Sequence, residues 1–231
     1  MDTNHKSDLI FKEVDFDPFA GSEVTIPTTE PQREIWTNVQ IGGDPANCSY
    51  NESVSLLLEG PFNFEVFRKS VDAVIVRHDA LRSTFSNDGL TLKISNSISV
   101  EVPLLDFSDH NDAIQKQKVK EVLNAEAEEP FDLIMGPLAR IKVIRLNSEK
   151  HQLVLSFHHI VCDGWSLGII MQDLGNYYSA FILGNVPELE PAVSFTEYAL
   201  SQEKFQSLSQ EHLLFSSHSQ SQKFSSFPCQ N

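Results

Sequence analysis

Apolar residues recur along the chain with two alternating periods, and this alternation predicts helices interleaved with short strands. Apolar positions three or four residues apart are typical of an amphipathic helix, and three segments show this spacing. They are a segment capped by Asn63 with Phe67, Val71, Val74 and Ile75, a charged segment over Asn111 to Glu128 with Val119, Val122 and Leu123 facing inward, and a segment with Leu167, Ile170, Met171, Leu174, Tyr178 and Phe181 that stops near Gly184. A further helix is predicted to start at Thr28-Thr29-Glu30-Pro31, where a hydroxyl cap precedes a proline.

Short runs rich in β-branched and apolar residues predict strands between these helices. The runs are Ser53–Leu58, Thr91–Ile94, Ile98–Val102, Ala139–Leu146 and Gln152–Phe157, and a polar turn over residues 147–150 separates the last two. The elements alternate without a strict strand–helix–strand rhythm and without an internal repeat. We therefore expect an α/β sandwich, in which a mixed sheet is flanked by helices.

Three stretches of different character divide the 231 residues. Residues 1–26 are polar with scattered aromatics and are expected to be a lead-in or linker, whereas residues 27–205 carry the periodic pattern of one globular domain, or of one lobe of a larger domain. From residue 206 onward this pattern ends, and the last 26 residues hold eight serines and no sustained periodicity. This tail is expected to be disordered or to result from a frame change after a truncation, and the sequence leaves both open.

Composition and charge limit the kinds of binding partner and the cellular compartment that we expect for this chain. The net charge of −15, without a cluster of lysine or arginine, would repel a polyanion, which argues against nucleic acid as a partner. The N-terminus lacks the basic and apolar regions of a secretory signal, and polar residues interrupt the most apolar helix, so we expect neither export nor a membrane span. Cys48, Cys162 and Cys229 are odd in number and far apart, which fits a reducing cytoplasm and indicates neither a disulfide framework nor a metal site.

The candidate chemistry lies in the segment HHIVCDG, residues 158–164, where a buried strand gives way to a helix. Adjacent residues on a strand point to opposite faces, so one of His158 and His159 is expected to pack inside while the other faces a cleft. A neutral imidazole can accept a proton at cytoplasmic pH. Asp163 is expected to lock the turn, Gly164 to let backbone approach closely, and the following helix to direct its positive end toward a developing oxyanion. Together these features are typical of an acyl transfer site.

Other interpretations of these residues remain open. A histidine at the end of a strand is most often a hydrogen-bonded core residue. Cys162 lies between the histidines and Asp163 and suggests a thiol nucleophile, although no group that would activate it is evident from the sequence. Trp36 and Trp165 are expected to pack in the core.

The segment HHIVCDG matches the HHxxxDG hallmark of the condensation domain family of nonribosomal peptide synthetases, and the chain resembles this family in four further segments. They are TEPQREIW (29–36), with Gln32 and Trp36 matching a Gln-x-x-x-Trp core; RHDALRSTF (77–85), similar to RHExLRTxF with Asp79 in place of Glu; EPFDLIMGPLAR (129–140), similar to PFDLxxGPLxR; and SFTEYAL (194–200), similar to YxDYAxW with Leu200 in place of the common Trp. All five occur in the family's order, across roughly residues 26–200.

The resemblance implies the first lobe of a two-lobed, chloramphenicol-acetyltransferase-like fold whose active site lies between the lobes. It also implies formation of an amide bond between a carrier-bound acyl or peptidyl thioester and a carrier-bound amino acid. His159 would deprotonate or position the attacking amine, with His158 and Asp163 as supporting residues and Asp163 paired to an arginine. Gly164 would line the channel and offer its N–H to the oxyanion.

The resemblance further implies the partners of the reaction. Donor and acceptor peptidyl carrier proteins would each present a substrate on a phosphopantetheine arm, beside other synthetase domains, and no metal or redox cofactor is implied. Arg77 and Arg82 are expected to be structural supports, because arginine favours fixed, fork-like pairing. His78 is expected to be a hydrogen-bonded residue at the end of a helix.

No signature of the second lobe follows residue 200, so the isolated chain is predicted to be weakly active or inactive. Three alternatives accompany the condensation hypothesis. The chain would be a non-catalytic remnant of a truncated synthetase, a coenzyme A-dependent acyltransferase of the same superfamily, or a small binding module with an incidental motif. The doubled histidine favours condensation over the second alternative, because those acyltransferases more often carry a single histidine at this motif.

Overall fold

The computed structural model describes residues 23–202 and 204 of the chain. Residues 1–22 of the expected lead-in and the expected tail, residues 206–231, lie outside the described residues. The elements, in chain order, are β1 (Val24–Pro27), α1 (Glu30–Cys48), β2 (Asn51–Glu59), α2 (Phe64–Arg77), the short 3-10 helix η1 (Asp79–Arg82), β3 (Ser83–Phe85), β4 (Thr91–Ile94), β5 (Leu104–Asp106), α3 (Asp112–Glu128), β6 (Ala139–Asn147), β7 (Lys150–His158) and α4 (Gly164–Ile182). A further helical segment begins at residue 195.

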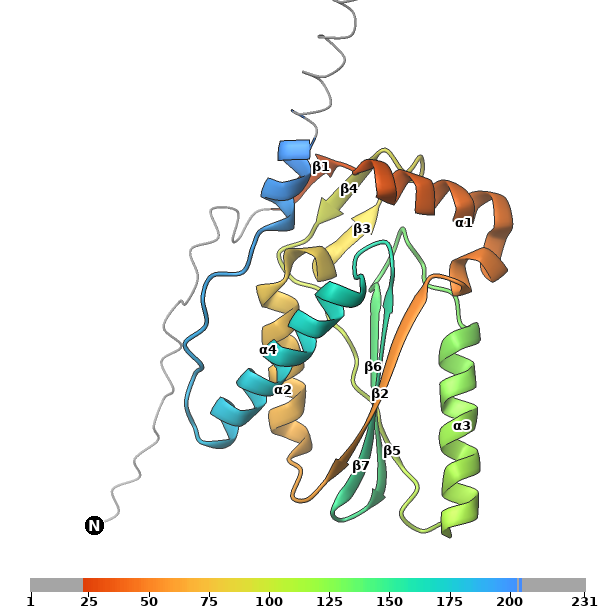
Figure 1. The fold of residues 1–231 in the computed structure, drawn as a ribbon, viewed down its shortest axis with the longest axis vertical. Helices are drawn as coiled ribbons and strands as arrows, with labels where there is room; N and C mark the ends of the chain where they lie inside the picture. Colours follow the sequence, from red (N-terminus) through yellow and green to blue (C-terminus); the bar gives the residue numbers. More distant parts are fainter. Residues whose placement is uncertain (1–22, 203, 205–231) are drawn as a thin grey trace, which may run out of the picture.

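The strands form two sheets. The larger sheet has the order β2-β7-β6-β5, with β5 parallel to β6 and the other neighbours antiparallel. The smaller, antiparallel sheet has the order β1-β4-β3. Helices α2 and α4 cover one face of the larger sheet and α3 lies against its other face (Figure 1). This arrangement confirms the predicted α/β sandwich with a mixed sheet flanked by helices.

Apolar burial fixes how the helices lie on the larger sheet. Alternate residues of β7, namely Leu153, Leu155 and Phe157, point toward α2 and α4 and form one buried cluster with them. A second buried cluster joins the smaller sheet to α1 and to the loop around Phe131. Strand β7 thus belongs to the core along its length and ends where the two clusters meet, at His158.

The capping signals in the sequence position two helix starts as predicted. The Asn63 side chain accepts the backbone N–H of Val66 at 3.1 Å and so begins α2. At α1 the Gln32 side chain accepts the backbone N–H of Thr29 at 3.0 Å, which is half of a capping box. These contacts are local in the sequence, which is why sequence patterns predict them well.

One expectation about elements is wrong, and the structure refines two others. Residues 98–102 form no strand, and β5 pairs with β6 instead. Val100 and Val102 are nevertheless buried, so the apolar alternation in this segment reflects burial and not strand pairing. Strand β1 begins at Val24, inside the expected lead-in, and pairs with β4. The expected inner stripe of α3 is only half-buried, and the fully buried residue of this helix is Glu126. Within the described residues, no helix has the length and apolarity needed to cross a bilayer.

Candidate active site

The candidate site lies in the turn between β7 and α4, over residues 159–163. Asp163 begins α4, because its carboxylate accepts the backbone N–H of Ser166 at 2.8 Å and the Ser166 hydroxyl at 2.7 Å. These hydrogen bonds lower the pKa of Asp163. The expected ion pair between Asp163 and an arginine is not formed among the described residues, since the carboxylate is used to cap the helix.

The two adjacent histidines point to different environments, as strand alternation predicts. His158 is fully buried, with the rings of Tyr50 and Phe131 each 5.9 Å from its own ring. Its Nδ1 accepts the backbone N–H of Ile160 at 3.2 Å, which leaves the proton of the neutral ring on Nε2. Burial, with His159 and Arg140 nearby, lowers the pKa of His158 to about 4. His158 is therefore a neutral packing residue at neutral pH.

His159 is half-exposed and lines a pocket. Its Nδ1 lies 3.1 Å from the carbonyl oxygen of Cys162 and 3.2 Å from a carboxylate oxygen of Glu52. Both neighbours are acceptors, so Nδ1 carries the proton of the neutral ring, and Nε2 keeps its lone pair. Among the described residues, Nε2 makes no hydrogen bond. The arrangement offers a proton acceptor at the edge of the pocket.

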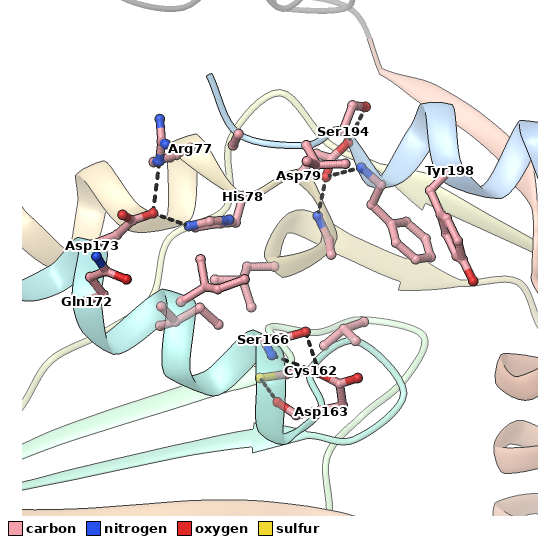
Figure 2. Close-up of a pocket in the computed structure, with 18 of the residues that line it drawn as sticks. Arg77, His78, Asp79, Cys162, Asp163, Ser166, Gln172, Asp173, Ser194 and Tyr198 are labelled. Atoms are coloured by element: carbon pink, nitrogen blue, oxygen red, sulfur yellow. Dashed lines mark hydrogen bonds and ion pairs between the residues drawn. The ribbon is translucent and has the colours of Figure 1, made fainter. Parts of the chain in front are cut away.

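The pocket has a volume of about 800 Å³ and is walled by the turn, α4, the corner between α2 and η1, and residues 189–198 (Figure 2). Apolar side chains make up much of its lining. Among its charged groups, Arg77, His78 and Asp173 lie together, Asp79 lies beside Ser194, and Asp163 lies beside Ser166 in the turn (Figure 2). A cavity that is mostly apolar with a few fixed polar groups is typical of a small-molecule site.

Arg77 and His78 both bind Asp173, which reaches them from α4. Arg77 Nε and His78 Nε2 each lie 2.9 Å from the same Asp173 oxygen, and all three side chains are largely buried. Burial lowers the pKa of His78 although Asp173 opposes this shift, so His78 is a neutral donor to the carboxylate. These contacts link the C-terminal end of α2 to α4 in one wall of the pocket.

Arg82 and Asp79 bind two segments near the pocket, the chain at residues 95–96 and the chain at residues 194–196. Arg82 donates to the carbonyl oxygens of Ser95 and Asn96, and within the part of the chain that the structure describes it donates no hydrogen bond to a histidine. Asp79 accepts the backbone N–H groups of Phe195 at 2.9 Å and Thr196 at 3.1 Å, together with the hydroxyls of both Thr196 and Ser194. Asp79 therefore starts the helical segment at residue 195, joining two stretches that the sequence separates by more than 100 residues.

Three further interpretations of residues in this region can be compared with the structure. Gly164 is exposed and does not line the pocket, and a Cβ placed on it would meet no described atom within 4 Å, so close approach within this lobe does not require glycine here. Trp165 is 88% exposed rather than in the core, because nothing among the described residues covers the first turn of α4 on that side. Burial and the charges of Asp163 and Glu52 raise the pKa of Cys162 to about 12, which removes it as a thiolate nucleophile.

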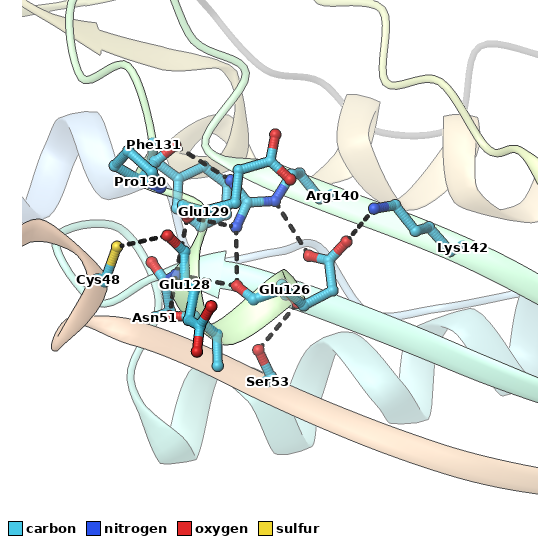
Figure 3. A network of polar contacts seen from close by, with 12 residues as sticks. Cys48, Asn51, Ser53, Glu126, Glu128, Glu129, Pro130, Phe131, Arg140 and Lys142 are labelled. Carbon is cyan, nitrogen blue, oxygen red and sulfur yellow. Dashed lines mark hydrogen bonds and ion pairs between the residues drawn. The ribbon is translucent and has the colours of Figure 1, made fainter. Parts of the chain in front are cut away.

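Two charged residues near the histidines were missed by the sequence analysis. The first is Glu52 on β2, beside His159. The second is Glu126, which is buried under the other face of the sheet, accepts a hydrogen bond from Arg140 at 3.0 Å and forms an ion pair with Lys142 (Figure 3). The helical stripe of Val119 and Leu123 continues to Glu126 at the next turn, so the spacing could have indicated its burial, although its charge concealed it.

Glu126 and Arg140 are also connected to His158 through the ring of Phe131. Burial opposes ionisation of Glu126, but the hydrogen bonds and charges of Lys142 and Arg140 outweigh it, and the pKa of Glu126 is lowered. The Arg140 guanidinium stacks 3.8 Å above the Phe131 ring, whose edge meets the ring of His158. A continuous set of contacts therefore runs from the ion pairs to the buried histidine.

Comparison with known proteins assigns the chain to a family. A sequence model of the Condensation domain family matches residues 22–215, which is most of the chain. The chain therefore belongs to the condensation domain family, as its five motifs predicted.

Its relatives include peptide synthetases much longer than this chain. The chain is 32% identical over 174 residues to malpibaldin synthetase of Mortierella alpina, covering 73% of this chain and 3% of that protein. It is 30% identical over 177 residues to phosphinothricin tripeptide synthetase PhsC of Streptomyces viridochromogenes, covering 75% of this chain and 16% of that protein. The chain thus spans only a small part of these relatives.

A solved structure of the starter condensation domain of rhizomide synthetase RzmA has the same fold. It superposes with a TM-score of 0.72 at 26% sequence identity, over 79% of this chain and 46% of that chain. The likeness confirms the predicted chloramphenicol-acetyltransferase-like fold. It also indicates that the chain corresponds to a partial domain, less than half of that structure.

Proposed function

We propose that this chain provides the histidine-bearing lobe of a condensation domain, which joins a carrier-bound acyl or peptidyl thioester to a carrier-bound amino acid through an amide bond. The observation that carries the proposal is the state of His159. Its Nδ1 is held 3.1 Å from the Cys162 carbonyl oxygen, and the ring lies at the edge of a pocket with the Nε2 lone pair available. Family membership supports the same conclusion.

The proposed reaction needs one acceptor for one proton. The amine nitrogen of the acceptor attacks the thioester carbonyl carbon, so a C–N bond forms and an oxyanion develops, and collapse of the oxyanion then breaks the C–S bond. The proton lost by the amine passes to Nε2 of His159 and from there to the leaving thiolate, which balances the charges. His159 acts in this scheme as a base, or holds the amine by accepting its N–H; both roles require the same lone pair.

The other site residues are proposed to support His159 without reacting. His158 is a neutral, buried residue beneath the turn, and Asp163 fixes the start of α4. The first N–H groups of this helix, including that of Gly164, have no partner within the helix and point from its positive end. They are candidate donors to the oxyanion.

The substrates are proposed to arrive on phosphopantetheine arms of donor and acceptor peptidyl carrier proteins, within a synthetase that holds further domains. The arm belongs to each substrate, so no residue of this chain is assigned to hold it as a resident cofactor. The relatives described above are peptide synthetases, and the histidine is doubled, so a coenzyme A-dependent acyltransferase is not favoured.

One lobe alone leaves His159 without an opposing wall. Orientation of two substrates and exclusion of water are both large contributions to rate, and both need a closed site. His159 is half-exposed, and Trp165 in the same region is almost fully exposed. We therefore expect the isolated chain to form little or no amide.

The test offers a thioester-loaded donor carrier and an amine-loaded acceptor carrier to two proteins. One is the chain alone, and the other is the chain fused to the C-terminal lobe of a related condensation domain. We expect amide from the fusion, its loss to background in His159→Ala, and retention in His110→Ala, an exposed histidine on a distant loop. Amide formation by the fusion that does not depend on His159 would contradict the proposed role. Product from the chain alone, above its His159→Ala variant, would overturn the need for a second lobe.

A further inference from the structure

Glu52 occupies a position where an apolar residue is expected. Strand β2 lies at the edge of the larger sheet, and its alternate residues Val54, Leu56 and Leu58 pack against the cluster formed with α2 and α4. Glu52 is next in this alternation and lies opposite Phe157, itself a member of that cluster. A carboxylate in this row does not add to the apolar packing that its neighbours provide, so its presence calls for another explanation.

The contacts of Glu52 point to His159. A Glu52 carboxylate oxygen lies 3.2 Å from His159 Nδ1, and both side chains are part-exposed, at 42% and 37%. Within the described residues the Glu52 side chain has no other hydrogen bond or ion pair. The hydrogen bond of Nδ1 goes to the Cys162 carbonyl oxygen, at 3.1 Å, and the Glu52 carboxylate lies at ion-pair distance from the same nitrogen.

We propose that Glu52 is a positioning residue for His159. Its carboxylate holds the proton on Nδ1, which keeps Nε2 free toward the pocket, and it offsets the positive charge of the imidazolium that forms when Nε2 takes up a proton. The catalytic meaning of this pair rests on the function proposed above, whereas the pairing itself does not.

The other groups around the ring do not replace Glu52. Asp163 is used by Ser166, His158 is neutral and faces away, and Cys162 keeps its thiol proton. Glu52 is therefore the one carboxylate of the described residues in contact with the imidazole. A carboxylate charge 3.2 Å from Nδ1 favours a proton on that nitrogen, so its removal should change the balance between the two ring tautomers.

The test measures the ring nitrogens of His159 by ¹⁵N NMR in the 231-residue chain, near pH 9, where an ordinary imidazole is neutral. His159→Gln assigns the signals. We expect the Nδ1–H tautomer to dominate in the wild type, to decrease in Glu52→Gln, which keeps a neutral acceptor, and to decrease further in Glu52→Leu. The ratio of Nε2–H to Nδ1–H forms should rise roughly threefold from wild type to Glu52→Leu, the scale of losing one ion pair at a part-exposed site.

Glu59→Gln is the matched control, because it removes the same charge from the other end of the same strand, where Glu59 pairs with Lys150. It should leave the His159 tautomers unchanged. Glu52→Leu should also unfold at the same temperature as the wild type or higher, since leucine continues the apolar row of β2. A purely structural Glu52 would instead show a lower melting temperature and unchanged tautomers.

Equal tautomer ratios in the wild type, Glu52→Gln and Glu52→Leu would overturn the proposal, because the Cys162 carbonyl would then suffice to hold the ring. A wild type that is mainly Nε2–H would overturn it as well. The amide assay described above is read separately. If the fusion forms no amide while the tautomer series holds, the pairing of Glu52 with His159 stands and the proposed reaction does not.

Discussion

The two faces of the larger sheet use charge in opposite ways. Under α3, Glu126 is buried and fully engaged by Arg140 and Lys142. On the face covered by α2 and α4, Leu153, Leu155 and Phe157 of β7 belong to an apolar cluster, and at the open end of the sheet Glu52 and His159 meet in a part-exposed pair. The two histidines at the end of β7 are divided between these faces. His158 points to the face under α3, and His159 points to the face covered by α2 and α4.

The difference separates the roles of the two histidines. His158 has its pKa lowered by burial and lies against the rings of Tyr50 and Phe131, so it can neither reach a substrate nor readily bind a proton. His159 keeps one nitrogen fixed and one open. The complete burial of His158 thus indicates a structural role. The imidazole of His159, held at one nitrogen beside a pocket, indicates a chemical role.

Glu126→Ala should have the largest effect on stability, because it leaves two cations without their carboxylate under the sheet. We expect a loss of about 3 kcal/mol in the free energy of unfolding, measured by chemical denaturation. Glu121→Ala, an exposed carboxylate on the same helix, should change it by less than about 0.5 kcal/mol. Similar losses for both variants would show that the buried network contributes little.

Acid should destabilise the chain through His158. Its pKa is about 4 in the folded state, whereas an unfolded histidine titrates near 6.5, so the unfolded state binds the proton more readily. The stability that depends on neutral His158 is complete above pH 6.5 and is lost as the pH falls toward 4, by on the order of 2–3 kcal/mol.

His158→Asn is the control for this acid effect, because its side-chain oxygen can still accept the Ile160 N–H while it cannot take up a proton. The stability difference between wild type and variant should be constant above pH 7 and should shift in favour of the variant below pH 6. Parallel pH profiles down to pH 4 would contradict the burial of a neutral His158.

Asp163→Ala should have an intermediate effect through the start of α4. Loss of the helix cap should cost about 1 kcal/mol, and amide hydrogen exchange in the first turn of α4 should become faster. Asp163→Asn retains a capping oxygen and should lose only a few tenths of a kcal/mol. If both substitutions cost the same, charge rather than capping holds this turn.

His159→Ala should have the smallest effect on stability, within about 0.5 kcal/mol by denaturation, because the ring is half-exposed and Glu52 remains solvated without it. The same substitution should abolish amide formation in the fused protein. The matched comparison is His158→Asn, which should alter stability more than His159→Ala does. A large loss of stability in His159→Ala would indicate a structural histidine and would weaken the functional contrast between the two.

Local signals determined much of the fold and the place of the candidate site. Helical spacing and caps, such as that of Asn63, predicted α2, α3 and α4, and the motif over residues 158–164 predicted a strand–turn–helix with divergent histidines. These predictions succeeded because periodicity and capping depend on residues within a few positions of one another. Motif order likewise predicted family membership, which the comparisons confirm.

Tertiary structure alone decided which distant groups meet. Nothing in the sequence indicates that Glu52 contacts His159, or that Asp79 starts the helical segment at residue 195, because each contact joins residues about 100 positions apart. Sequence patterns also misassigned residues 98–102, where burial imitates the alternation of a strand, and Trp165, whose exposure depends on what covers α4. The physical reason is the same in each case: a side chain's neighbours across the fold, and not its neighbours along the chain, set its burial and its hydrogen-bond partners.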